Sequence, residues 1–191
     1  VGHVEAGLRT NNILSPWPEE ANRKIISTLA DMNFAPTDLA RDNLLRENVD
    51  PATVHVTGNT VIDALHAVRR RLQENRYQVS VHEPRLLEDL DGDKRLILMT
   101  AHRRENWGDG IAAICNAALR LVARGDTFVV FPVHPNPRVS DMVHDVLGNH
   151  PDIFLLEPLA YADFVLMLDR AAIVLTDSGG VQEEAPALGK P

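Results

Sequence analysis

Residues 176–184 (TDSGGVQEE) join the end of an apolar strand to a serine, two glycines and the start of a helix. Gly179 and Gly180 let the backbone approach a ligand closely, because they carry no side chain. The N–H groups at a helix start attract phosphate oxygens. Glu184 lies one turn further and could accept hydrogen bonds from ribose hydroxyls. The segment predicts a phosphate site; the alternative is an ordinary helix start capped by Ser178.

Two other segments place polar side chains directly after a predicted strand. Residues 100–108 (TAHRRENWG) contain His102 and Arg103, which could clamp an anion there. A plain charged surface loop is the alternative. Residues 132–137 (PVHPNP) hold His134 in a turn made rigid by prolines. For this histidine, contact with a ligand and a satisfied buried position are both open.

Two acidic residues could divide the work of proton transfer. Glu5 lies in residues 3–9 (HVEAGLR), at the end of the first predicted strand, and Glu19 lies in residues 15–23 (SPWPEEANR), which open a helix. Two carboxylates in one cleft can hold different pKa values and act as acid and base. The alternatives are a charge pair of Glu5 with a neighbour, and a surface pair of Glu19 with Arg23 four residues on.

The composition excludes several other functions. The chain has 19 Lys and Arg against 27 Asp and Glu, a net charge of −8, which argues against a general nucleic-acid binder. One cysteine, Cys115, excludes an internal disulfide, and without Cys-x-x-Cys or His-Glu-x-x-His spacing no metal site is predicted. No apolar run approaches the roughly 20 residues of a membrane helix. Because no signal peptide is recognised either, we expect a cytoplasmic protein without a membrane partner.

The elements that must position these residues alternate between short apolar strands and amphipathic helices. Strands are predicted at residues 1–5, 33–35, 54–56, 96–100, 128–133, 153–156 and 173–176. Helices are predicted at residues 18–30, 38–47, 60–75, 111–124, 139–147, 161–169 and 181–188. This alternation predicts an α/β fold with parallel strands and right-handed crossovers, whose ligands lie beyond the carboxyl ends of the strands.

Further details concern the helices and the connection between the halves of the chain. Thr37 is expected to cap the helix at residues 38–47. The helix at residues 18–30 is expected to carry three apolar residues on one face: Ala21, Ile25 and Leu29. The helix at residues 111–124 is expected to bury Ile114, Ala118 and Leu121. Residues 76–94 are polar and irregular, which taken alone is typical of a linker; the other candidate for the connection is the tight turn at residues 57–60 (TGNT).

Taken together, the motifs resemble the non-hydrolysing UDP-N-acetylglucosamine 2-epimerases of bacteria. The resemblance rests on residues 3–9, 15–23, 57–65 (TGNTVIDAL), 102–106, 132–137 and 176–191 (TDSGGVQEEAPALGKP), which follow the family's order. It implies two Rossmann-like domains arranged as in the GT-B glycosyltransferases, with a UDP-sugar in the cleft. Residues 1–58 would be the later part of the N-terminal domain, and residues 59–191 the earlier part of the C-terminal, UDP-binding domain. The chain would then be an internal fragment of a longer protein.

The resemblance also implies roles for individual residues. Three match the family's catalytic groups: Glu5, Glu19 and His102. Six match positions that bind UDP: Leu159, Phe164, Ser178, Gly179, Gly180 and Glu184. Of these, the serine and glycines hold the diphosphate, the glutamate binds the ribose, and the leucine backbone and phenylalanine surround the uracil. Three more lie inside family motifs and are expected to play supporting roles: Arg9, Arg103 and His134.

The activity implied is the interconversion of UDP-GlcNAc and UDP-ManNAc, for precursors of cell-surface polysaccharides. UDP is eliminated to give a 2-acetamidoglucal and is then added back, with no cofactor or metal. The resemblance further implies a homodimer and, in some members, activation by the substrate itself. The alternatives are a 2-epimerase for a related UDP-diacetamido-uronic sugar, a GT-B glycosyltransferase and a non-catalytic UDP-sugar-binding protein. The isolated fragment is expected to be inactive.

Overall fold

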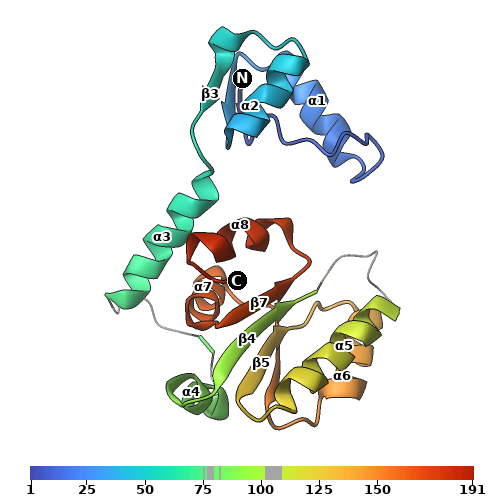
Figure 1. The fold of residues 1–191 in the computed structure, drawn as a ribbon, viewed down its shortest axis with the longest axis vertical. Helices are drawn as coiled ribbons and strands as arrows, with labels where there is room; N and C mark the ends of the chain where they lie inside the picture. The colour runs from blue at the N-terminus through green and yellow to red at the C-terminus, as the bar shows by residue number, and fades with distance from the viewer. Residues whose placement is uncertain (75, 77–79, 82, 102–108) are drawn as a thin grey trace. The chain divides into compact units, whose positions relative to one another are not determined.

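The computed structural model describes residues 1–74, 76, 80–81, 83–101 and 109–191 of the chain. These residues form two compact units, Val1–Asp63 and Ala64–Pro191, which are described separately (Figure 1). The predicted domain boundary between residues 58 and 59 stays a prediction.

The first unit is built on a small parallel sheet with the strand order β1-β2-β3. Its strands are β1 (Gly2–Val4), β2 (Met32–Ala35) and β3 (Val54–Val56). Helix α1 (Glu19–Leu29) connects β1 to β2, and α2 (Asp38–Arg46), followed by the short 3₁₀ helix η1 (Pro51–Thr53), connects β2 to β3. Thr37 caps α2 as predicted, since its hydroxyl accepts a hydrogen bond of 3.1 Å from the N–H of Ala40.

Helix α1 does not bury the apolar face that its sequence suggests. Ile25 and Leu29 are 58% and 69% exposed, whereas Glu20 and Ser27 are buried. The polar side of α1 packs inward instead: the buried carboxylate of Glu20 accepts backbone N–H groups, and the Ser27 hydroxyl joins a charged network described below.

The second unit is a four-stranded parallel sheet with the order β6-β5-β4-β7, which confirms the predicted α/β class. Its strands are β4 (Arg95–Thr100), β5 (Thr127–Pro132), β6 (Ile153–Leu156) and β7 (Ile173–Thr176). The helices that follow these strands are α5 (Asp109–Val122), α6 (Pro137–Leu147), α7 (Tyr161–Arg170) and α8 (Gly179–Ala187). Helix α3 (Thr60–Gln73) begins in the first unit and continues into the second.

Both faces of this sheet are covered by helices, which explains the unbroken apolar runs of its strands. Side chains of α5 and α6 pack against one face, and side chains of α3, α7 and α8 pack against the other (Figure 1). The prediction for α5 was partly wrong, because Ile114 and Leu121 are only partly buried. The fully packed stripe instead consists of Ile111, Cys115, Ala118 and Val122.

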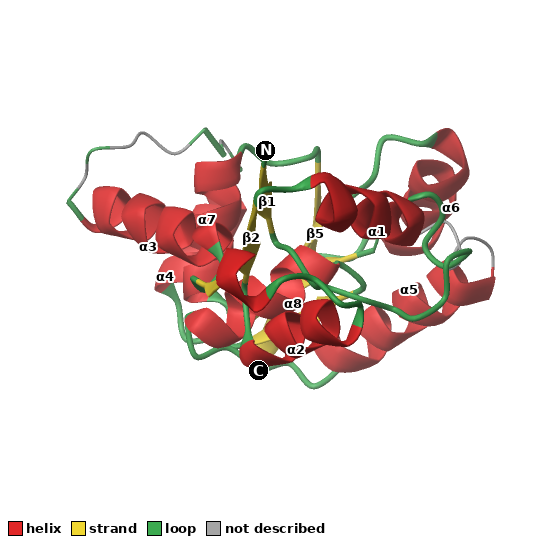
Figure 2. Cartoon of the chain, turned by 90° about the horizontal axis from the view of Figure 1, so that it is seen from above, coloured by secondary structure: helices red, strands yellow, loops and turns green. Residues whose placement is uncertain are grey.

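The polar stretch at residues 76–94 is not simply a linker. It contains the helix α4 (Pro84–Asp91), which is drawn as a helix in Figure 2. Leu86 is fully buried and Leu90, one turn later, packs against the same core cluster. Pro84 stands in the first turn, where its missing N–H costs nothing. These two leucines are therefore enough to anchor an otherwise charged helix.

Candidate functional site

The carboxyl ends of all four strands of the second unit meet at one edge, because the strands are parallel. From β4 the chain proceeds to β5 and β6 on one side, and it returns to β7 on the other side. Ligands of open α/β sheets bind at such a change of direction, here between β4 and β7. The residues that follow these two strands are thus the first candidates for a site.

The turn from β7 into α8 is the segment that is predicted to bind phosphate. Ser178 occupies the N-cap position of α8, but its side chain makes no capping hydrogen bond. Gly179 and Gly180 are exposed, and a Cβ on Gly180 would meet only the Ser178 hydroxyl, at 4.0 Å. The helix begins at Gly179, two residues earlier than predicted. The first-turn N–H groups therefore come from the diglycine segment itself.

Two threonine hydroxyls join the last residues of β4 and β7. The register pairs Thr100 with Thr176, and their Oγ1 atoms lie 2.6 Å apart. Thr176 Oγ1 also accepts a hydrogen bond of 2.9 Å from the N–H of Ser178. Neither threonine was predicted to have a role, although each is the last residue of a predicted strand. That position is the signal that could have drawn attention to them.

Glu184 is buried on α8 and is held by a tyrosine at the start of α7. The Tyr161 hydroxyl donates a hydrogen bond of 2.9 Å to Oε1 of Glu184. Burial raises the pKa of Glu184, and the bond from Tyr161 works against that rise. Burial and the same bond raise the pKa of Tyr161 to about 12. Tyr161 thus engages one carboxylate oxygen of Glu184, and a carboxylate has further acceptor positions for the hydroxyls of a sugar. No sequence signal pairs two residues this far apart.

His134 stands in a locked turn beside a cavity at the carboxyl edge. The cavity measures 410 Å³ and is lined by residues after β4, β5 and β6, including Ala101, His134 and Leu159. The N–H of Asn136 donates a hydrogen bond of 3.1 Å to Nδ1 of His134. Since Nδ1 accepts, the ring hydrogen of the neutral histidine is on Nε2. The turn therefore presents the imidazole in one defined tautomer.

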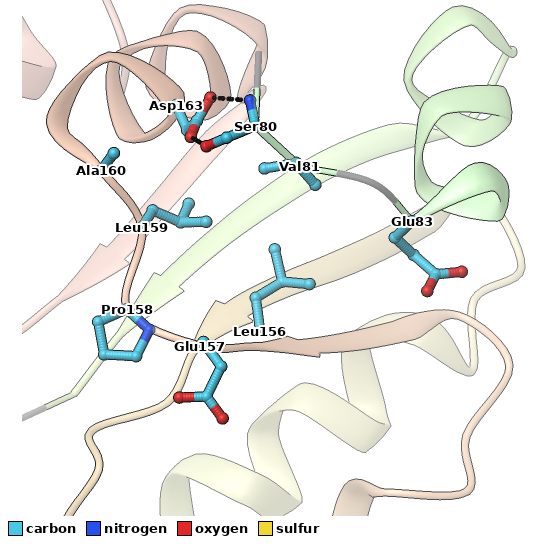
Figure 3. A pocket seen from close by; sticks show the side chains of 9 residues that line it. All are labelled: Ser80, Val81, Glu83, Leu156, Glu157, Pro158, Leu159, Ala160 and Asp163. Atoms are coloured by element: carbon cyan, nitrogen blue, oxygen red, sulfur yellow. Dashed lines mark hydrogen bonds between the residues drawn. The ribbon is translucent and has the colours of Figure 1, made fainter.

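A second cavity of 370 Å³ adjoins the loop between β6 and α7 (Figure 3). Leu159 lines both cavities, while Phe164 is partly buried against the core. The buried carboxylate of Asp163 accepts hydrogen bonds from the N–H and the hydroxyl of Ser80, which stands 83 residues earlier. This pair, drawn with dashed lines in Figure 3, ties the segment before α4 to the first turn of α7.

In the first unit, Glu5 lies in a sharp turn directly after β1. Its φ is +59°, in the left-handed region that few non-glycine residues adopt, and Gly7 follows with φ +84°. The turn is anchored to β2 because the N–H of Ala6 donates a hydrogen bond of 3.0 Å to the carbonyl of Phe34. The catalytic role of Glu5 stays a prediction.

The buried side chain of Arg9 belongs to a partly exposed charged network behind this turn. Its side chain is 1% exposed, and its Nη2 lies 2.8 Å from Glu47 Oε2 and 3.1 Å from Ser27 Oγ. Lys24 adds a second cation, with Nζ 2.7 Å from Glu47 Oε1. The hydrogen bond from Arg9 is the main reason that the pKa of Glu47 falls to about 2. In this structure Arg9 therefore holds α1 and α2 together.

His3 lies on the edge of the same network. Its Nδ1 is 3.2 Å from Ser27 Oγ. Burial is the main cause that lowers the pKa of His3, and the positive charge of the neighbouring Arg9 lowers it further. The imidazole is thus favoured in its neutral form beside the turn that carries Glu5.

Glu19 and Glu20 are adjacent in sequence but have different surroundings. Glu19 is 51% exposed and forms the expected (i, i+4) ion pair with Arg23, at 2.7 Å. Glu20 is fully buried, and its two carboxylate oxygens accept the N–H groups of Thr10 and Asn11, at 3.1 and 3.2 Å. Glu20 is thus a support for the turn before α1. The catalytic role of Glu19 stays a prediction.

Two predicted site residues, His102 and Arg103, lie outside the described residues. Within the described ranges, no three His, Cys, Asp or Glu side chains gather where they could hold a metal ion. None of the helices in this described part of the chain has the length and apolarity needed to span a membrane.

Comparison with known proteins covers the whole chain. The family model described as UDP-N-acetylglucosamine 2-epimerase matches residues 1–191. A protein of Ralstonia nicotianae named probable UDP-N-acetylglucosamine 2-epimerase is 54% identical over 193 residues, which cover 100% of this chain and 51% of the relative. The chain thus spans about half the length of the curated relatives it matches.

Two solved structures show the same fold. The UDP-GlcNAc 2-epimerase of Neisseria meningitidis, bound to UDP-GlcNAc, is 43% identical and has a TM-score of 0.85, covering 100% of this chain and 51% of that one. The S. aureus protein MnaA, solved with UDP, is 44% identical with a TM-score of 0.88, covering 100% and 50%. With the family model matched from end to end, this chain belongs to the UDP-N-acetylglucosamine 2-epimerase family.

Proposed function

We propose that this chain is part of a non-hydrolysing 2-epimerase that interconverts UDP-GlcNAc and UDP-ManNAc. The observation that carries the proposal is the turn at Ser178, Gly179 and Gly180, where α8 begins directly after β7 with two exposed glycines. It stands at the change of strand direction where an α/β sheet binds ligands. Membership of the family, and the UDP-GlcNAc and UDP bound by two relatives, support a UDP-sugar as the ligand.

The reaction cannot be a direct deprotonation, because no carbonyl neighbours C2 of the sugar and its hydrogen is not acidic. In the proposed reaction a carboxylate takes the C2 proton while the bond from C1 to the UDP oxygen breaks. The electron pair of the C2–H bond forms a C1–C2 double bond, and UDP carries away the pair of the broken bond. Protonation of C2 from the opposite face and return of the UDP oxygen to C1 give the epimer.

The residues of the second unit suit the leaving group. N–H groups at the start of α8 would stabilise the negative charge that develops on the diphosphate. Glu184, with one oxygen held by Tyr161, would accept hydrogen bonds from the ribose hydroxyls. We assign His102 to the diphosphate as well, and Leu159 and Phe164 to the uracil, on the family resemblance. His134 and Arg103 keep their supporting roles in the proposal.

The residues of the first unit suit the transfer of the proton. Glu5 and Glu19 are proposed to take part in this transfer, since carboxylates are the groups that the chemistry requires. The left-handed backbone at Glu5, and the hydrogen bond that anchors the next residue to β2, support a fixed position for the first of these. Activation by the substrate, a homodimeric assembly and a cytoplasmic location are further predictions that rest on the resemblance and the composition.

One experiment separates this proposal from its competitors. The intact protein is incubated with UDP-GlcNAc in heavy water, and C2 of the sugar is followed by NMR. We expect deuterium at C2 and the appearance of UDP-ManNAc. A glycosyltransferase would leave the C2 hydrogen in place, a binding protein would form no product, and a hydrolysing relative would release free ManNAc. The same assay with a UDP-diacetamido-uronic sugar tests the related epimerase.

A further inference from the structure

We propose that Thr100 and Thr176 form a hydroxyl bridge that positions the diphosphate-binding turn. The inference rests on the proposed function and adds two positioning residues to it. The bridge joins the last residues of β4 and β7, at the change of strand direction, with 2.6 Å between the Oγ1 atoms. Both side chains are partly buried.

The bridge leads directly to the turn. Thr176 Oγ1 accepts the N–H of Ser178 at 2.9 Å, so that one hydroxyl connects Thr100 to the N-cap residue of α8. A second contact reinforces it, since the N–H of Asp177 lies 3.4 Å from the carbonyl of Thr100. The Ser178 hydroxyl does not cap α8, so these contacts set where the helix starts. The bridge thereby determines the orientation of the first N–H groups of α8.

The bridge also involves a second segment that is predicted to bind the diphosphate, because Thr100 directly precedes that segment in the sequence. The residue is followed by Ala101 and then by the histidine that the family resemblance assigns to the diphosphate. A contact between the ends of β4 and β7 therefore links the two segments expected to hold one diphosphate. Electrostatic stabilisation of a leaving group depends on donors fixed in advance, and a hydroxyl pair fixes the end of β4 relative to the end of β7.

The test uses valine and serine variants of the intact protein. Thr176→Val is nearly isosteric but removes both the bridge and the acceptor for Ser178, whereas Thr100→Val removes the bridge alone. Two quantities are measured: the Kd for UDP, by calorimetry, and the KM for UDP-GlcNAc. We expect both to rise about tenfold in Thr176→Val, which loses two hydrogen bonds, and about threefold in Thr100→Val, which loses one. Thr176→Ser and Thr100→Ser keep the hydroxyls and should stay within about twofold of the wild type.

Thr127→Val provides the matched control. Thr127 is a buried threonine at the opposite end of β5, and its hydroxyl donates a hydrogen bond of 2.9 Å to the carbonyl of Leu121. Its loss should lower the unfolding temperature and leave the KM unchanged. A double-mutant cycle of the two bridge positions should show non-additive effects, because Thr176→Val already removes what Thr100→Val removes.

Three results would count against the bridge. Unchanged UDP affinity in both valine variants of an active enzyme would overturn the inference. So would additive effects of the two valine substitutions, because they would show that the two hydroxyls act independently. An equal rise of KM in Thr127→Val would also count against it, because it would indicate a general loss of stability. A wild-type protein that neither binds UDP nor exchanges the C2 hydrogen would instead show that the proposed function is wrong.

Discussion

The carbonyl oxygen of Ala40 in α2 occupies the space beside Gly7 where any other residue would place its Cβ. A Cβ built on Gly7 would lie 2.0 Å from that oxygen and 2.6 Å from the carbonyl carbon. The neighbouring amide of Asn43 adds a hydrogen bond of 2.9 Å to the carbonyl of Gly7. The turn that carries Glu5 is therefore seated directly on the backbone of α2.

Replacing Gly7 by alanine should severely destabilise this turn. The new Cβ would force two backbone segments apart, and the residue would also carry a left-handed φ of +84°. We expect a loss of about 3 kcal/mol or more, the sum of overpacking and an unfavourable φ. Gly58→Ala is the control, because Gly58 has φ +76° but nothing within 4 Å of its Cβ, so it should cost only about 1 kcal/mol. Thermal unfolding that ranks the two variants equally would contradict this explanation.

The ion pair of Arg9 and Glu47 should make the stability of the protein depend on acid pH. The folded pKa of Glu47 is about 2, below its ordinary value of 4.5. The stabilisation is therefore present above pH 4.5 and is lost as the pH falls towards 2. Glu47→Gln should lose about 2 kcal/mol near pH 7, less than a fully buried pair, because the Glu47 side chain keeps 29% exposure.

Calorimetry of the wild type and Glu47→Gln across that range provides the check. The difference in unfolding temperature should shrink as the pH falls from 4.5 to 2. Asp38→Asn removes an exposed (i, i+3) partner of Arg41 and should have little effect at any pH. A difference between the wild type and Glu47→Gln that is constant with pH would mean that the carboxylate charge is not what stabilises the network.

Local patterns were enough to predict most of the strands and helices. The apolar runs at residues 153–156 and 173–176 coincide with β6 and β7, because strands covered on both faces are apolar throughout. Helix α4 was missed although Leu86 and Leu90 stand four residues apart after Pro84. Its many charged residues hid that short periodicity. A helix of this length depends on tertiary packing, which periodicity alone does not report.

The candidate site was only partly predictable. The turn at Ser178 could be found because glycines between a strand and a helix have few other uses. Which of Glu19 and Glu20 would be buried could not be known, since it depends on where the N–H groups of residues 10 and 11 lie. The contacts of Ser80 with Asp163 and of Tyr161 with Glu184 join residues far apart in sequence. Such pairs follow from the packing of whole elements rather than from spacing.

Removal of the Tyr161 hydroxyl should raise the pKa of Glu184 further. The hydrogen bond from Tyr161 favours the carboxylate and opposes the effect of burial. In Tyr161→Phe the carboxyl should therefore titrate at a higher pH, which NMR of a carboxyl-labelled protein would show. An unchanged or lowered pKa would mean that the phenol does not stabilise the charged form. UDP affinity should fall as well, because the carboxylate loses the contact that orients it.

The raised pKa of Glu184 also predicts how stability changes with pH. Because the folded pKa lies above the ordinary value of 4.5, the folded protein keeps its proton when the unfolded chain has lost it. This contribution is fully present below pH 4.5 and is lost as the pH rises through the folded pKa. Glu184→Gln does not titrate, so the wild type should lose stability relative to this variant over that rise. Parallel unfolding profiles would contradict the assigned shift.

Glu5→Gln and Glu19→Gln should each lower the turnover of the intact enzyme by roughly 10²–10⁴-fold, the usual contribution of a general acid or base. The amide keeps the shape of the side chain but can neither take nor return the C2 proton. Exchange of the C2 hydrogen in heavy water should slow in parallel, because it reports the same proton transfer, while the affinity for UDP should change little.

Glu88→Gln, on the exposed side of α4, is the control and should keep full activity. Full turnover in both Glu5→Gln and Glu19→Gln would remove these carboxylates from the chemistry, and a loss confined to Glu5→Gln would leave Glu19 in the surface ion pair with Arg23 that the structure shows.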